Sequence, residues 1–363
     1  MTDTDEHRKR FLAGRTGSRL RGLLLGMALG ETVGTARGKL PDQGPLRAGV
    51  CTQLACFTTE GTIRALVRGN HKGICHAPSV MWHAYCRWAA MQDIERDLME
   101  GRWGGFGQTW PDGWLAQVPV LGERRGSAPA TVAALSRVEQ GTYDRPATES
   151  SGWHALGRTL PTAALTALGF PGPIVSTEVA ALTHGSVEAQ SATAHAVVLL
   201  RQCLEGSRIE DSLRTGLADL RTNERAAGGL EQGRLDAALQ AAADHPADAT
   251  RLAALAPDLT AVSALLGGLY VAASLPGRTQ VEAALHFASL SPAGPSVACV
   301  TGALLGAAHG VEALPVDLVS RHELAWVLDT LARDLVTQVQ DSPSGSEYVE
   351  GWDPHWWGRY PGW

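Results

Sequence analysis

The chain has 363 residues, of which 44% are hydrophobic and 19% are charged, and its formal net charge is -6 at pH 7. This composition is typical of a folded globular protein and excludes disorder as the dominant state. An acidic chain without a basic stripe is not expected to bind nucleic acid, whereas a nucleotide-sized ligand stays compatible with it.

The cellular location is predicted from the N-terminus, the apolar runs and the cysteines. Residues 1–18 are polar and mixed in charge, and no apolar run reaches the roughly 18 residues that cross a bilayer. The six cysteines are widely spaced, which is typical of reduced thiols: Cys51, Cys56, Cys75, Cys86, Cys203 and Cys299. We therefore expect a soluble, cytoplasmic protein with no membrane partner, whose residues 1–18 form a polar tail.

Helical periodicity recurs along the chain, and no stretch shows the alternation of a strand. The fold is therefore predicted to be all-α, and residues 19–363 are expected to form a single domain because no linker or repeat divides them. In chain order, helices are predicted over 19–30, 52–69, 78–92, 176–205, 210–222, 233–243, 259–274, 279–288 and 296–309. Glycine and proline clusters predict loops over 34–49, 101–114, 122–130, 140–152, 169–173 and 289–295.

The clearest predicted helix begins at Ser320. Ser320 and Glu323 have the spacing of a capping box, in which two side chains satisfy the first free amides of a helix. The apolar residues that follow recur on one helical face: Leu324, Val327, Leu328, Leu331 and Leu335.

Gly22, Gly26 and Gly30 recur at four-residue spacing on the first predicted helix. Side chains four residues apart share one face of a helix. The pattern predicts a second helix packed unusually close to this face, and backbone approach to a ligand is the alternative.

Several sequence blocks resemble one known family. Residues 19–34, RLRGLLLGMALGETVG, are similar to the first helix of the ADP-ribosylglycohydrolases of the dinitrogenase-reductase-activating-glycohydrolase type. Further blocks resemble that family in the same order: TQLACFTTEGTIRAL at 52–66, ALTHGSVEAQSATAHAVVLL at 181–200, VTGALLGAAHGVEALP at 300–315 and WWGRYPGW at 356–363. The resemblance implies a compact orthogonal bundle of more than ten helices with one ligand cleft, and a relation to lens crystallins such as crystallin J1.

The resemblance also implies a metal site that this chain does not reproduce. The family hydrolyses ADP-ribosyl glycosidic bonds with two Mg²⁺ ions held by aspartates. Aligned on the matching blocks, those aspartates fall on Val50, Cys51, Ala293 and Pro295. Magnesium requires oxygen ligands, and the nearby hydroxyls of Thr52 and Ser296 are too few to hold two ions. We therefore expect no metal and no cofactor. The cysteines and histidines at 71–86 match no compact zinc pattern.

The family's glycine-rich ligand loop aligns with residues 149–161, where Gly152, Arg158 and Pro161 persist. Two loop glycines are replaced by His154 and Ala155, and Trp153 stands beside them. The resemblance implies a cleft that binds a nucleotide-like or ADP-ribose-like ligand. The residues expected to line it are Cys51, Thr52, Gly152, Trp153, Arg158, His184 and Ser296. Trp153 is expected either to stack on a planar ring or to plug the former ribose site. Cys51 is expected to be a small filler, with a nucleophile as the alternative.

Glu31, Glu149 and His154 are the ionisable groups expected near this cleft. Two carboxylates on either side of a glycosidic bond can hydrolyse it without a metal, so these three residues are the predicted catalytic set. The alternative is that Glu149 is solvated and Glu31 bonds a helix terminus.

The last thirteen residues, GWDPHWWGRYPGW, are unusually aromatic. Such a segment is expected to pack across the helical bundle, and a surface for a protein partner is the alternative.

Two functions follow as expectations. The first is a degenerate ADP-ribosylglycohydrolase-like protein that binds a nucleotide-like ligand or a protein partner without catalysis. The second is a repurposed metal-independent hydrolase of a glycosidic bond in an ADP-ribosylated or nucleotide-derived small molecule.

Overall fold

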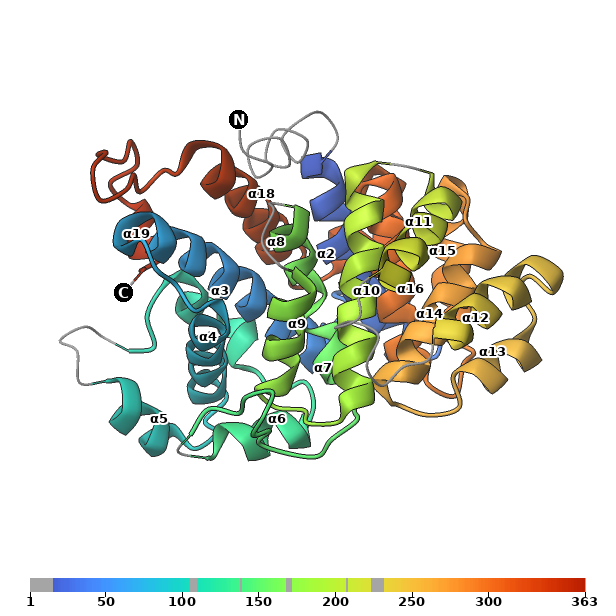
Figure 1. Ribbon diagram of the computed structural model, residues 1–363, viewed down its shortest axis with the longest axis horizontal. Helices are drawn as coiled ribbons and strands as arrows, with labels where there is room; N and C mark the ends of the chain where they lie inside the picture. The colour runs from blue at the N-terminus through green and yellow to red at the C-terminus, as the bar shows by residue number, and fades with distance from the viewer. Residues whose placement is uncertain are drawn as a thin grey trace.

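The computed structural model describes residues 16–104, 110–137, 139–167, 172–206, 208–222 and 232–362. These ranges fold into helices joined by loops, and only isolated β-bridges occur among them. The predicted all-α class is therefore confirmed. Figure 1 shows α3 and α4 on one side of the molecule and α12 to α15 on the other, with α2, α10 and α16 between them.

The helices of more than three residues in α-form have the following bounds: α2 Thr16–Thr35, α3 Val50–Lys72, α4 Ala77–Met91, α5 Arg96–Trp103, α6 Pro129–Leu135, α7 His154–Gly157, α8 Ala163–Ala167, α9 Gly172–Ala181, α10 Val187–Glu205, α11 Ile209–Thr222, α12 Gln232–Asp244, α13 Ala249–Leu255, α14 Ala261–Ser274, α15 Val281–Ala288, α16 Gly294–His309, α17 Val316–Arg321, α18 Ala325–Asp341 and α19 Trp356–Arg359. More than ten helices form, as the family resemblance implied.

One predicted helix is divided in two. Residues 176–205 were expected to be continuous, but α9 ends at Ala181 and α10 begins at Val187. The Ser186 side chain accepts a hydrogen bond from the Ala189 amide and caps α10. A Cβ atom on Gly185 would overlap the Thr148 carbonyl oxygen, so the chain passes close to the preceding loop here. The helical periodicity continued across the break, which explains the error.

The capping-box prediction at Ser320 is wrong. Ser320 lies inside α17, where its hydroxyl donates to the Asp317 carbonyl oxygen at 2.9 Å. Glu323 accepts a hydrogen bond from the Ala48 amide at 2.8 Å and forms an ion pair with Arg125 at 2.8 Å. Tertiary partners therefore use the carboxylate that the local pattern assigned to the helix start, and α18 begins only at Ala325. Its predicted apolar face is buried.

Other boundaries differ more modestly from the predictions. The helices that were not predicted are all short: α5, α6, α7, α8, α13, α17 and α19. Of these, α5 extends into the expected loop 101–114, and α6 begins within the expected loop 122–130. Of the expected polar tail 1–18, residues 1–15 lie outside the described ranges, and Thr16 already begins α2. Residues 169–171 of the expected loop 169–173 also lie outside them, and α9 begins at Gly172.

Helices α2 and α16 pack against each other along the glycine face that the sequence predicted. A Cβ atom on Gly26 would overlap the Gly302 carbonyl oxygen, and one on Gly22 would overlap that of Gly306. The close helix packing is therefore confirmed, and only glycine permits this separation. The contact places the end of α2, with Glu31, beside the start of α16.

The described helices include none that is both long enough and apolar enough to span a membrane.

Candidate functional site

The carboxylate of Glu31 binds the start of α3. Its Oε1 accepts from the Cys51 amide at 3.1 Å, and its Oε2 accepts from the Thr52 amide at 2.7 Å and from the Thr52 hydroxyl at 2.6 Å. A carboxylate suits the partial positive charge of a helix N-terminus. A Cβ atom on Gly49 would overlap this carboxylate, so glycine is needed immediately before α3.

The environment of Glu31 changes its acidity. Burial raises the pKa of its carboxyl above 4.5, and the hydrogen bonds from Thr52 and Cys51 only partly oppose that effect. Both carboxylate oxygens are occupied by the protein. The structure thus places Glu31 at a helix terminus, which was the alternative to its predicted catalytic role.

The Cys51 side chain is buried next to a second thiol. It lies beside the thiol of Cys299 on α16, and both side chains are fully buried. Burial, supported by Cys299 and by the negative charge of Glu31, raises the pKa of Cys51 well above its usual value. A thiol acts as a nucleophile only as the thiolate. The position of Cys51 is therefore that of a packed core side chain.

Trp153 fills the space beside Cys51. Trp153 is only 6% exposed. A Cβ atom added to Gly157 would lie 2.5 Å from the Cys51 sulfur and 2.8 Å from the Trp153 ring, so both side chains pack against this glycine. The His154 ring also packs against the indole, with ring centroids 4.7 Å apart and the planes tilted by 48°. The Trp153 amide donates to the Leu259 carbonyl oxygen at 3.0 Å, which ties the loop to the start of α14. This is the packing expected of a plug.

Arg158 joins three segments of the core. Its Nη1 donates to the Thr183 hydroxyl at 2.5 Å and its Nη2 to the Val179 carbonyl oxygen at 2.9 Å, while the guanidinium lies 4.7 Å from the Tyr85 ring centroid. The whole side chain is buried. Its contacts are with other protein groups, and they hold α7 against the turn between α9 and α10.

Two histidines, the buried His184 and the partly buried His154, lie close to Arg158. Burial, with a further contribution from the Arg158 charge, lowers the pKa of His154 to about 4. Burial also lowers the pKa of His184 well below its usual value, with smaller contributions from the Arg158 charge and from His154. His184 Nδ1 lies 2.7 Å from the Thr183 hydroxyl. Both imidazoles are therefore neutral at pH 7, so neither can supply a positive charge to a ligand.

The other predicted site residues are placed differently. The hydroxyl of Ser296 donates to the Ala293 carbonyl oxygen at 2.9 Å and is buried. Gly152 forms a β-bridge with Thr260. Glu149 is exposed on the preceding loop. Thus the buried residues Glu31, Cys51, Thr52 and Trp153 gather in one cluster with the partly buried His154, whereas Glu149 lies at the surface.

The cluster offers a poor set of donors for magnesium. Its side-chain oxygen atoms belong to Glu31 and Thr52, which are hydrogen-bonded to each other, and the nearby Ser296 hydroxyl of the expected site is bonded to the Ala293 carbonyl oxygen. Among the described residues, no group of three or more His, Cys, Asp or Glu side chains is arranged to hold a metal ion. The residues present therefore do not fit the two-magnesium centre that the resemblance implied.

Cavities occur at other places in the fold. One of about 720 Å³ is lined by residues near Arg19, Arg278 and His309, and one of about 430 Å³ lies between Asp112 and Trp357. Neither is lined by any residue of the buried cluster around Trp153.

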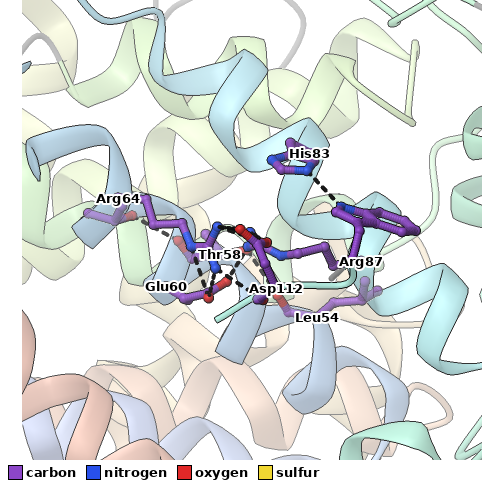
Figure 2. A network of polar contacts seen from close by, with 9 residues as sticks. Leu54, Thr58, Glu60, Arg64, His83, Arg87 and Asp112 are labelled. Carbon is purple, nitrogen blue, oxygen red and sulfur yellow. Dashed lines mark hydrogen bonds and ion pairs between the residues drawn. The ribbon is translucent and has the colours of Figure 1, made fainter. Parts of the chain in front are cut away.

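A network of four buried charges, which was not predicted from the sequence, lies further along α3 (Figure 2). The Glu60 carboxylate binds Arg87 and also Arg64, the latter at 2.9 Å, and Asp112 lies 3.2 Å from each of the two guanidinium groups. The Glu60–Arg64 spacing of four residues was the only local signal. Two positive and two negative charges balance, which is what makes their burial tolerable.

The network fixes the loop around Asp112 against α3 and α4. Burial by itself would raise the pKa of Asp112, but the charges of Arg87 and Arg64 outweigh it and lower the value. In the same loop the indole nitrogen of Trp110 donates to His83 Nε2 at 3.0 Å. Because Arg64 and Arg87 come from different helices, the network also fixes α3, whose first turn holds Cys51 and Thr52.

We expect a specific pH dependence from Glu31. Its pKa is raised on folding, so the folded state holds the proton more tightly, and stability should fall as pH rises from about 4.5 through the folded-state value. Glu31→Gln should remove this slope, which for one group is at most about 1.4 kcal/mol per pH unit. Urea unfolding of both proteins at several pH values measures the difference. Glu282→Gln, at an exposed carboxyl on α15, is the control, and equal slopes for wild type and Glu31→Gln would contradict the assignment.

Comparison with known proteins identifies a family for this chain and, separately, a solved structure with the same fold. A model of the family described as ADP-ribosylglycohydrolase matches residues 13–344. A solved structure described as an ADP-ribosylglycohydrolase-related protein complex is similar over 90% of this chain and 99% of that chain, with 21% identity and a TM-score of 0.55. At this identity the likeness shows the fold. No curated protein matches the chain significantly.

Proposed function

Because the chain belongs to the ADP-ribosylglycohydrolase family, we propose that it is a degenerate member that has lost the two-magnesium reaction and acts by binding. The proposed binding target is a nucleotide-like ligand or a protein partner. One observation carries the proposal: the cluster around Trp153, where the family's ligand cleft is expected, is filled by the protein's own side chains.

The contacts of that cluster support the loss of catalysis. Cys51 stands at an expected aspartate position and packs against Cys299, and Thr52 donates its hydroxyl to Glu31. A metal-dependent hydrolase needs open coordination positions for water and substrate. Here the Thr52 hydroxyl and the Glu31 carboxylate are hydrogen-bonded to each other, and the ring of Trp153 occupies the neighbouring space.

The same filling favours a protein partner over a small ligand. A nucleotide in the expected cleft would have to displace Trp153, whose ring packs against Gly157 and His154. Expelling a buried indole exposes a large apolar surface to water. A partner that binds the outer surface of the molecule meets no such barrier.

The metal-independent hydrolase is the alternative proposal, and the geometry supports it less. It requires two carboxylates on either side of one glycosidic bond. Glu149 is exposed, whereas Glu31 is buried with both oxygens bonded to the start of α3. Hydrolysis of an ADP-ribosylated small molecule in the presence of chelator, abolished by Glu149→Gln, would establish this alternative.

The proposal predicts the result of a metal titration. Calorimetric titration of chelator-treated protein with Mg²⁺ or Mn²⁺ is expected to show no pair of stoichiometric sites, because the positions of the family's aspartates hold Val50, Cys51, Ala293 and Pro295. The same preparation should not release ADP-ribose from arginine- or serine-linked protein substrates. Two sub-millimolar sites together with release that stops on adding chelator would overturn the proposed function.

A further inference from the structure

The segment before α19 folds into a compact loop, residues 342–353, which we call the C-terminal arm. The Ser346 amide donates to the Val349 carbonyl oxygen at 2.8 Å, and the Asp353 amide donates to that of Pro343 at 3.1 Å. Gly345 has a φ of 76°, a conformation that favours glycine. In Figure 1 the arm is the dark red loop that projects from the molecule beyond α18.

The arm is fastened to the end of α3 and is thus held in one position. The side-chain amide of Asn70 donates to the Ser342 hydroxyl at 3.0 Å, and the Glu347 amide donates to the Asn70 carbonyl oxygen at 3.3 Å. Next to it, the rings of His71 and Trp357 meet edge to face at 4.8 Å. A loop ordered before binding loses little conformational entropy when a partner arrives.

The aromatic tail divides into a packed part and an exposed part. Trp356 and Tyr360 are buried, and the Trp356 indole donates to the Gln338 side chain at 2.7 Å, as expected for packing across the bundle. In the arm, by contrast, Tyr348 is 88% exposed, Val349 64% and Trp352 63%. Exposed aromatic and apolar side chains gathered on one short loop are typical of an interaction surface.

The charge of this surface is strongly negative. Asp341, Glu347, Glu350 and Asp353 lie within fourteen residues, and the stretch 341–354 contains no lysine or arginine. None of the four carboxylates forms an ion pair with another described residue. Their charge would repel a nucleic-acid backbone or an anionic membrane and attract a basic segment.

Aromatic rings beside carboxylates recognise guanidinium groups. The planar cation stacks on a ring while its N–H groups bind carboxylate oxygens. This chain uses the same arrangement internally: the Arg359 guanidinium lies 4.7 Å from the Trp114 ring centroid and binds Asp334 at 2.6 Å. The arm presents both halves of such a site on its surface, without an arginine of its own.

We propose that the C-terminal arm is a docking surface for an arginine-rich segment of a protein partner. Tyr348 and Trp352 would stack on guanidinium groups, and Glu347 and Glu350 would pair with them. The inference rests on the proposed function, in which the protein acts by binding, and it names the surface and the chemistry of the partner.

The experiment uses the full chain and a fluorescein-labelled peptide of alternating arginine and glycine, with fluorescence anisotropy as the readout. Tyr348→Ala and the double variant Glu347→Gln, Glu350→Gln should each weaken binding by about tenfold or more. The matched controls are Tyr143→Ala, at an exposed tyrosine on another loop, and the double variant Glu95→Gln, Glu282→Gln, which removes the same charge elsewhere. Both controls should bind like wild type, and melting curves should show all variants folded.

Several results would overturn the docking proposal: no binding of the arginine peptide by wild type, equal binding by the arm variants, or equal binding of a peptide with neutral citrulline in place of arginine. Equal losses in arm and control variants would show only general attraction to an acidic protein, which also overturns it. Metal-dependent release of ADP-ribose would overturn the proposed function and leave the peptide result standing, so the two failures are distinguishable.

Discussion

Trp153→Ala is expected to lower the free energy of unfolding by roughly 3–5 kcal/mol, the range for removing a large buried aromatic side chain. The reason is that the indole packs against Gly157 and His154 and Trp153 is only 6% exposed, so removing the ring leaves a cavity beside Cys51. Urea unfolding followed by circular dichroism measures the change. Binding of adenosine, NAD or ADP-ribose, followed by calorimetry, should be unchanged or improved in the variant.

The control for this prediction is Trp352→Ala, which removes the same side chain from the exposed arm and should leave stability nearly unchanged. A different result would contradict the interpretation of Trp153 as a plug of the former ribose site. If Trp153→Ala unfolded like wild type but bound a nucleoside more weakly by about 1–3 kcal/mol, Trp153 would be a stacking surface for a ligand. Such a result would also restore the nucleotide-like ligand as the favoured target.

Arg87→Met should also lower the free energy of unfolding by roughly 3–5 kcal/mol, because it removes one partner from a buried ion-pair network. Glu60 and Asp112 would then share the single positive charge of Arg64 inside the protein (Figure 2). Methionine keeps much of the arginine's apolar volume, so the loss would report the unpaired charge more than a cavity. Thermal and urea unfolding of the purified variant give the measurement.

Arg96→Met is the matched control, because Arg96 forms an exposed pair with Glu100 at 2.8 Å and solvent screens such pairs. No clear change in stability is expected there. If Arg87→Met were as stable as wild type, the network would contribute nothing beyond its own desolvation. The loop that carries Asp112 would then be held by other contacts.

Much of the fold could be predicted because its causes are local. Helical periodicity identified most helices, and the repeating Gly22, Gly26 and Gly30 predicted the close packing of α2 on α16. The errors arose where distant residues intervened. Glu323 binds Ala48 and Arg125 and leaves the capping box unformed, and the turn at Gly185 interrupts a periodic stretch.

For the site, the sequence alone determined the family resemblance and the residue types that stand at the expected metal positions, because both are properties of aligned letters. Only the tertiary structure decided that Glu31 bonds the start of α3, that Trp153 is buried and that Tyr348 and Trp352 are not. Periodicity and spacing report which neighbours a residue has along its own helix. Burial, pKa and pairing depend on which segments pack together, and those segments lie far apart in this chain.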